Sequence, residues 1–366
     1  MILPKLYKRS STGKIVEWEI EVRDGDPVQI VTRHGQTDGK IQEGFRDVRS
    51  GKNIGKANET TALEQAALEA KSKWTLRQKK GYCADPSGIN LNQKPLPMLA
   101  HKFMERKHNI KYPCAVQPKL NGVRCLTKRV PAQQMIEFTS RGGNDFETLG
   151  HLVLPLARIL TIDQMLDGEI YVHGWSFQKI IRRVKRAEEQ YDDVTELEYW
   201  IYDMPDKADF QDRWKWITEN VPDDPSLKLV KTPTYIVESE DEIHRYHDIF
   251  IEQGFEGIII RNLKGGYRFQ YNNKNLQKLK KFHDDEFEVI GAKEGQGKES
   301  GCVIWVCKTR DGKEFDVRPE GTLEERRILF QEASNYFGKM YTVRYQDLSE
   351  DGIPMILTGI AFRDYE

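Results

Sequence analysis

The chain has 366 residues, of which 38% are hydrophobic and 31% charged, so it is polar yet able to build ordinary cores in about two or three domains. No apolar run approaches the roughly 18 residues that span a bilayer, and the first residues lack the apolar stretch of a secretory signal. Five cysteines without a C-x-x-C pair argue against a disulfide framework or a zinc site. We therefore expect a soluble, cytoplasmic protein without a membrane partner.

The N-terminal third of the chain is basic. Residues 1–110 carry 20 Lys and Arg against 13 Asp and Glu, although the whole chain has a net charge of −1. Phosphate contacts dominate nucleic-acid affinity, so this excess could serve nucleic-acid binding. The excess is modest, and a basic domain without that role fits it nearly as well.

Two strands are predicted near the N-terminus, at Ile15–Val22 and Val28–Arg33, and His34-Gly35 is expected to end the second. A helix is predicted from Asn58 onward, because apolar residues recur there at helical spacing until Gly81 provides a stop.

This arrangement within residues 1–82 resembles a WGR domain, a DNA-binding module. Thr32–Lys40 stands where that family has its Trp-Gly-Arg signature and the following turn, but the tripeptide itself is absent. The resemblance implies that the domain engages a DNA end or nick. A stabilising β-sheet domain is the alternative.

Residues 83–110 are predicted to form a linker, rich in proline, and a leading helix from Met98 to His108. Residues 111–282 mix strands and helices. The predicted elements there are strands at Ala115–Gln117, Val123–Thr127, Met165–Tyr171, Tyr199–Tyr202 and Gly257–Arg261, and a basic helix at Gln178–Gln190.

Residues 283–366 are β-rich. The predicted elements are strands at Glu286–Ile290, Val303–Val306, Phe315–Val317 and Tyr341–Tyr345, and a helix at Glu324–Phe337. Short strands with one helix are typical of an OB-fold β-barrel, a common nucleic-acid binder. The fold class expected for the whole chain is α+β.

The most informative segment is Gln117–Arg124, in which Lys119 stands shortly before Gly122 and Arg124. A lysine amine can attack the α-phosphate of a nucleotide, a glycine lets the backbone approach the phosphates, and an arginine binds sugar or phosphate. K-x-x-G alone carries no weight in a lysine-rich chain. It gains weight because partners follow in a fixed order, namely Ser140-Arg141-Gly142, Asp167-Gly168-Glu169, Tyr202-Asp203, Glu256–Arg261 and Lys278-Leu279-Lys280.

This ordered series resembles the covalent nucleotidyltransferases, and specifically the ATP-dependent DNA ligases of compact viral or bacteriophage type. The resemblance implies a nucleotidyltransferase adenylation domain (ATP-grasp-like) followed by the OB-fold. It also implies ATP and Mg²⁺ as cofactors, nicked double-stranded DNA as the partner, and a monomer that acts in the host-cell cytoplasm if the chain is viral.

Elementary chemistry agrees with that resemblance. A lysine has an unperturbed pKa of about 10.4 and attacks only when unprotonated. Neighbouring cations and burial lower that pKa, and Lys278, Lys280, Arg124 and Arg261 are the candidate cations.

The resemblance assigns the nucleotide-binding roles residue by residue. Lys119 matches the lysine that becomes covalently bound to AMP. Gln117 stands where a residue contacts adenine, and Tyr202 where an aromatic ring stacks on it. Arg124 matches an arginine that holds ribose and nick, and Arg261 joins the cofactor-binding set.

The same resemblance assigns the charged groups around the phosphates. Glu169 matches an acid that contacts ribose and metal, and Glu256 a metal carboxylate. Lys278 and Lys280 match the lysines at the α-phosphate, and Arg141 an arginine that meets the 5′-phosphate of the nick.

The match is loosest at the C-terminal end, where Pro354–Arg363 resembles a terminal motif that orients the leaving pyrophosphate through Arg363.

One position departs from the family pattern. DNA ligases usually carry K-x-D-G, whereas this chain has Asn121, which keeps the size and one acceptor of aspartate but loses its charge. An RNA ligase of the same superfamily is therefore one alternative. The others are a capping guanylyltransferase and a nick-binding protein whose catalytic site has decayed.

Asn121→Asp is expected to preserve or raise the rate of covalent AMP labelling, because it restores the carboxylate that supports the lysine in related enzymes. Labelling with α-³²P-ATP followed by a denaturing gel measures this rate. Complete loss of labelling would show that the amide has a dedicated role.

Overall fold

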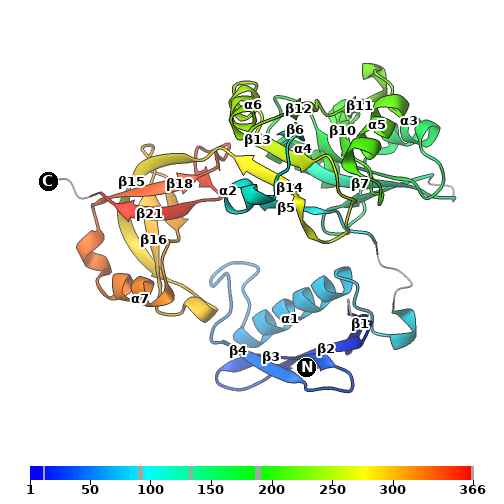
Figure 1. Ribbon diagram of the computed structural model, residues 1–366. Helices are drawn as coiled ribbons and strands as arrows, with labels where there is room; N and C mark the ends of the chain where they lie inside the picture. The colour runs from blue at the N-terminus through cyan, green and yellow to red at the C-terminus, as the bar shows by residue number, and fades with distance from the viewer. Residues whose placement is uncertain (11–12, 90–93, 132–134, 186–190, 364–366) are drawn as a thin grey trace. The chain divides into compact units, whose positions relative to one another are not determined.

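The computed structural model describes residues 1–10, 13–89, 94–131, 135–185 and 191–363 (Figure 1). The chain divides into two compact units, Pro95–Lys281 on the one hand and Met1–Lys94 with Phe282–Glu366 on the other. Within the described ranges no helix is long and apolar enough to cross a membrane.

The N-terminal segment forms an antiparallel sheet of order β1-β2-β3-β4 with one helix, α1, packed on one face (Figure 1). Its elements are β1 (Leu6–Arg9), β2 (Ile15–Arg23), β3 (Val28–Gln36), β4 (Gln42–Val48) and α1 (Ala62–Lys79). Trp18 and Ile20 are buried beneath Ala66 and Ala70, whose small side chains let α1 approach the sheet closely.

Two N-terminal predictions are corrected. The second strand does not end at His34-Gly35 but continues to Gln36. The helix begins at Ala62 rather than Asn58, because Thr61 caps it through a reciprocal pair of hydrogen bonds with Glu64.

The unit Pro95–Lys281 contains two five-stranded sheets, of order β12-β6-β13-β14-β5 and β11-β10-β9-β7-β8. The strands of the first sheet are β5 (Leu99–Lys102), β6 (Cys114–Lys119), β12 (Tyr235–Val237), β13 (Gly257–Asn262) and β14 (Asn272–Lys280). Those of the second are β7 (Val123–Arg129), β8 (Ile136–Ser140), β9 (Met165–Tyr171), β10 (Glu198–Asp203) and β11 (Leu229–Lys231). The α-helices of this unit are α2 (Phe103–Arg106), α3 (Val153–Ile159), α4 (Phe177–Lys185), α5 (Phe210–Asn220) and α6 (Glu240–Glu252).

All five predicted strands of this unit are confirmed, but the helix predicted at Met98–His108 is mostly wrong. Its first part is strand β5, which pairs in parallel with β14, and the α-helix is limited to α2. The sheet partner overrides the local pattern here. The helix predicted at Gln178–Gln190 is confirmed to Lys185, and its remaining residues lie outside the described ranges.

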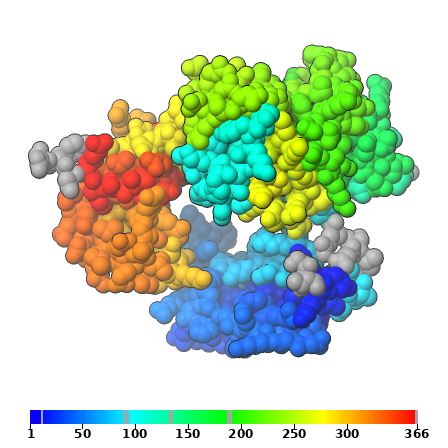
Figure 2. Space-filling model, in the orientation of Figure 1, coloured from blue at the N-terminus to red at the C-terminus, as the bar shows by residue number. Residues whose placement is uncertain are grey.

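Segments distant in sequence pack together in this unit. The segment Leu99–Asn109, cyan in Figure 2, lies against β14 and α6, drawn in yellow and light green. Lys107 donates from Nζ to Oε1 of Glu240 on α6 at 2.8 Å, and Gln277 of β14 donates to the carbonyl oxygen of Arg106 at 2.7 Å.

The chain crosses from the first sheet to the second at Leu120–Gly122, between β6 and β7. A Cβ on Gly122 would lie 2.5 Å from the carbonyl oxygen of Ile170 and 2.8 Å from Cγ of Glu169. Only glycine therefore permits this close crossing, which sets Lys119 of one sheet beside Glu169 of the other.

The C-terminal segment forms a five-stranded sheet of order β17-β16-β15-β18-β21. Its elements are β15 (His283–Glu294), β16 (Val303–Lys308), β17 (Glu314–Val317), α7 (Leu323–Gln331), β18 (Met340–Tyr345) and β21 (Thr358–Phe362), with a small ribbon of β19 (Asp347–Leu348) and β20 (Pro354–Met355). The edge strands do not pair as strands in the described ranges, but an isolated parallel bridge joins Pro319, just after β17, to Gly359 of β21. The four predicted strands are confirmed, whereas the helix ends at Gln331 and continues only as a 3₁₀ turn, Ala333–Tyr336.

Candidate active site

Three neighbouring strands bring the predicted lysines together. β13 lies between β6 and β14, and its first residue, Gly257, pairs with Lys119 on one side and Lys280 on the other. The N–H of Glu256 donates to the carbonyl oxygen of Lys119 at 3.0 Å. A Cβ on Gly257 would lie 2.3 Å from the carbonyl oxygen of Leu279, so glycine is required for this approach of β14.

The Glu256 carboxylate bridges two ammonium groups. One oxygen pairs with Nζ of Lys119 and the other with Nζ of Lys280, and all three side chains are largely buried. Burial alone would raise the pKa of Glu256, but the two lysines together lower it below its ordinary value. Glu256 is therefore ionised, and the Lys119 ammonium must leave this pair and lose a proton before it can act as a nucleophile.

Further cations surround this pair. Burial lowers the pKa of Lys278, and Lys280 and Lys119 lower it further. Burial likewise lowers the pKa of Lys280, with Lys119 as the next cause. Arg141, exposed at the turn after β8, adds to both effects. Cations outnumber the carboxylate here, which suits a chain of phosphates.

Glu169 lies on β9 close to the same lysine. Burial raises its pKa to about 7, and Lys119 and Arg124 oppose that rise. The hydroxyl of Tyr202 donates to Oε2 of Glu169 at 3.2 Å. Glu169 therefore takes up or releases a proton near neutral pH, according to what binds beside it.

Arg124 is held by a buried acid. Its Nε and Nη2 donate to the two oxygens of Asp167 at 3.0 and 2.6 Å, and Tyr267 donates its hydroxyl to Asp167 at 2.6 Å. The guanidinium lies 5.6 Å from the centre of the Tyr202 ring. Its Nη1 makes no hydrogen bond within the described ranges, so it can still donate to a ligand.

Gln117 and Arg261 belong to a second buried array. Nε of Arg261 donates to Oε1 of Gln117 and Nη1 to Oδ2 of Asp203, both at 2.7 Å. Arg213 on α5 donates to the same Asp203 at 2.7 and 3.1 Å.

The predicted site residues therefore fall into two groups. Those that the structure places within one unit, around the crossing of its two sheets, are Gln117, Lys119, Arg124, Arg141, Glu169, Tyr202, Glu256, Arg261, Lys278 and Lys280. Arg363 lies just after β21 in the C-terminal sheet, where its Nε pairs with Glu286 at 2.6 Å.

No role was assigned from the sequence to the residues that hold this site in place. Asp167 and Asp203 belong to two of the quoted motifs, so their membership of those motifs was a usable signal. Tyr267 and Arg213 lie outside the quoted motifs, and no pattern in the sequence marked them.

The carboxylates available to a metal ion are Glu169 and Glu256. The described part of the chain contains no group of three or more His, Cys, Asp or Glu side chains that could hold a metal. Mg²⁺ uses one or two carboxylates and takes its other ligands from water and phosphate. These two residues therefore suit a Mg²⁺ site of that kind and not a site in which protein side chains supply every ligand.

Comparison with known proteins decides the family. Residues 97–280, half of the chain, match the family described as ATP dependent DNA ligase domain. The DNA ligase of African swine fever virus, strain Badajoz 1971 Vero-adapted, is 31% identical over 99% of this chain and 94% of its own length. That of isolate Tick/South Africa/Pretoriuskop Pr4/1996 is 30% identical over the same shares.

The chain belongs to the ATP-dependent DNA ligases.

Solved structures agree with this ligase in fold. A Lig E DNA ligase, described as DNA binding with a minimal scaffold, has a TM-score of 0.61 and 20% identity over 74% of this chain and all of its own. The structure titled Pmar-Lig_PreS3 has a TM-score of 0.64 and 20% identity over 82% of this chain and 72% of its own. The predicted α+β class, a nucleotidyltransferase domain followed by an OB domain, is confirmed, and the RNA ligase alternative is not favoured.

Glu169 is expected to make stability depend on pH in metal-free buffer. Its pKa rises from 4.5 to about 7 on folding, so the fold favours the protonated form and loses stability as pH rises from 4.5 through 7. Glu169→Gln, which carries no charge, should be more stable than the parent by on the order of 1–3 kcal/mol at pH 8.

Urea unfolding at pH 5 and pH 8 measures this difference, with Glu147→Gln at an exposed position of the same unit as the control. The difference should shrink toward pH 5. An equal difference at both pH values would contradict the assignment of a raised pKa.

Proposed function

We propose that this ligase joins a 5′-phosphate to a 3′-hydroxyl at a nick in duplex DNA through a covalent Lys119–AMP intermediate. The observation that supports it is the contact of Lys119 and Lys280 with one carboxylate, Glu256, beside Lys278 and Arg141. This arrangement provides a lysine nucleophile and cations for the phosphates in a partly buried cluster of side chains.

The reaction would proceed in three nucleotidyl transfers. The unprotonated Lys119 amine attacks the α-phosphorus of ATP, a nitrogen–phosphorus bond forms, and the bond to the bridging oxygen breaks to release pyrophosphate. An oxygen of the DNA 5′-phosphate then attacks the same phosphorus, and Lys119 leaves and regains a proton. The 3′-hydroxyl finally loses its proton to solvent and attacks the phosphorus of the 5′-phosphate, which forms the phosphodiester and releases AMP.

The surrounding residues would position the reactants. Tyr202 stacks on adenine and Gln117 contacts its edge, while Arg124 uses its remaining N–H groups on ribose or phosphate. Lys278 and Lys280 stabilise charge on the α-phosphate. Arg141 and Arg363 keep their predicted roles at the nick phosphate and at pyrophosphate.

Magnesium fits this scheme through Glu169 and Glu256. When bound, Mg²⁺ would supply positive charge that stabilises the phosphate oxygens. The Glu256 carboxylate would then be shared between metal and lysines, which gives a reason for its position between them.

Lys119→Ala is expected to abolish covalent AMP labelling, because Lys119 is the residue that matches the adenylated lysine of the family. Incubation with α-³²P-ATP and Mg²⁺, a denaturing gel and a chase with nicked DNA measure both the adduct and its transfer. Lys128→Ala is the control, since Lys128 pairs with Asp163 at 2.9 Å outside the site. Persistent labelling of Lys119→Ala would place the nucleophile elsewhere.

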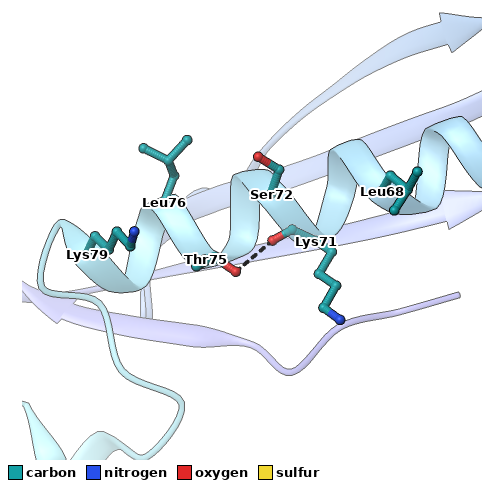
Figure 3. A pocket seen from close by; sticks show the side chains of 6 residues that line it. All are labelled: Leu68, Lys71, Ser72, Thr75, Leu76 and Lys79. Atoms are coloured by element: carbon teal, nitrogen blue, oxygen red, sulfur yellow. Dashed lines mark hydrogen bonds between the residues drawn. The ribbon is translucent and has the colours of Figure 1, made fainter. Parts of the chain in front are cut away.

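We further propose that the N-terminal sheet-and-helix segment contacts DNA through the outer face of α1. Along about three turns a shallow hollow is lined by Leu68, Lys71, Ser72, Thr75, Leu76 and Lys79 (Figure 3). Lysines and hydroxyls on one helix face suit phosphate contacts.

The opposite face of the sheet is unsuited to DNA. Trp18 and Ile20 of β2 face α1, so Glu19 and Glu21 project from the other side. Arg33, within the segment compared with the WGR signature, pairs there with Glu19, Glu21 and Glu43 at 2.7, 2.9 and 2.6 Å. Its charge is already compensated.

Lys71→Glu with Lys79→Glu is expected to weaken binding of nicked duplex and to reduce the slope of log K against log salt by about 2. The control, Lys5→Glu with Arg23→Glu, makes the same charge change on the sheet face, where both residues pair with glutamates. Fluorescence anisotropy at several salt concentrations measures both. If the two double variants weaken DNA binding and lower the salt slope equally, the proposal that α1 contacts DNA is overturned.

A further inference from the structure

A buried array of charges lies behind the proposed base-contacting residue. Gln117 is 1% exposed, Asp203 0%, Arg213 2% and Arg261 4%. These residues come from β6, β10, α5 and β13, so the array joins both sheets of the unit. Buried charges persist only when paired, and here every charge has a partner.

The chemistry of the neighbours fixes which way the Gln117 amide points. Arg261 can only donate, so the group that meets its Nε must be Oε1 of Gln117. The carbonyl of Tyr202 can only accept, so the group 3.2 Å from it must be Nε2.

A third neighbour requires the same orientation. Nε2 of Gln117 also donates to Oγ1 of Thr234 at 2.9 Å. That hydroxyl donates its own proton to the carbonyl oxygen of Thr232 at 2.9 Å, so it acts as an acceptor toward Gln117. Turning the amide over would set Oε1 against two acceptors and Nε2 against the Arg261 donor.

Arg261 is itself fixed by two further residues. Oδ2 of Asp203 accepts from Nη1 of Arg261 at 2.7 Å, and the same carboxylate accepts from Nε and Nη2 of Arg213. Arg213 is anchored from its Nη1 to the carbonyl oxygens of Ala208 and Gly265 at 2.5 and 3.0 Å. The orientation of the amide thus depends on residues that no ligand needs to touch.

We propose that Arg213, Asp203 and Arg261 are positioning residues that make the enzyme select adenine over guanine, an inference that rests on the proposed contact of Gln117 with the base. Both N–H groups of the amide are committed, and Oε1 keeps one lone pair. A base edge at this position therefore meets an acceptor. The 6-amino group of adenine can donate to it, whereas the 6-carbonyl oxygen of guanine is repelled, because the buried amide cannot turn over.

The test compares the rates of covalent labelling by α-³²P-ATP and α-³²P-GTP over a range of concentrations of each nucleotide. Arg261→Met removes the donor to Oε1, so the preference for ATP should fall by about 10-fold or more. The change should come mainly from a higher KM for ATP, and Arg261→Lys, which keeps a donor, should retain part of the preference.

Arg213→Lys provides a second variant in case Arg261→Met does not fold. The lysine keeps a positive charge beside Asp203 but loses the two parallel N–H donors of arginine. The preference for ATP over GTP should therefore fall less than with Arg261→Met. Thermal unfolding checks that each variant is folded before the rates are compared.

The outcomes separate two failures. If the parent enzyme is not labelled by ATP at Lys119, the proposed function fails. If the parent is labelled and the folded variants lose ATP and GTP labelling by the same factor, the positioning inference is overturned and the lysine assignment stands.

Discussion

The ion pairs of Glu256 with Lys119 and Lys280 are the interaction on which the site depends. They arise from strand register, because the first residue of β13 pairs with β6 on one side and β14 on the other. Gly257 makes this possible, since a side chain there would collide with the backbone of β14. The close approach that glycine allows thus sets where Lys119 lies, and the same carboxylate that holds this lysine in place also engages its amine in an ion pair.

Around these ion pairs, the other buried charges of the unit are paired with groups of opposite charge. Arg124 is fixed by Asp167, and Arg261 by Asp203, each acid almost completely buried. Such pairs add little net stability, but removal of one partner leaves an unpaired buried charge that costs several kcal/mol. The expected gain is a fixed direction for each guanidinium group before a nucleotide binds, so that under the proposed function little reorganisation is needed during reaction.

Much of this could be predicted from the sequence, and the exceptions have physical reasons. Motif residues such as Lys119 and Glu256 are recognisable because their residue types and their order along the chain match those of a known family. Arg213 belongs to no motif, because it contacts Asp203 and not a ligand. Its position in the sequence depends on how α5 packs, which the sequence pattern does not indicate. The helix predicted at Met98–His108 failed because its first residues pair with β14, a strand more than 170 positions later. Arg363 lies in another unit, so its role at the pyrophosphate stays a prediction.

The most direct test of this account is the site-resolved reactivity of the lysine amines in metal-free, nucleotide-free protein. Reductive ¹³C-methylation followed by peptide mass spectrometry gives a rate for each lysine, with Lys128 as internal reference. If Glu256 engages both amines in ion pairs, Glu256→Gln should raise the rates at Lys119 and Lys280 and leave Lys128 unchanged. Unchanged rates at Lys119 and Lys280 would contradict the account.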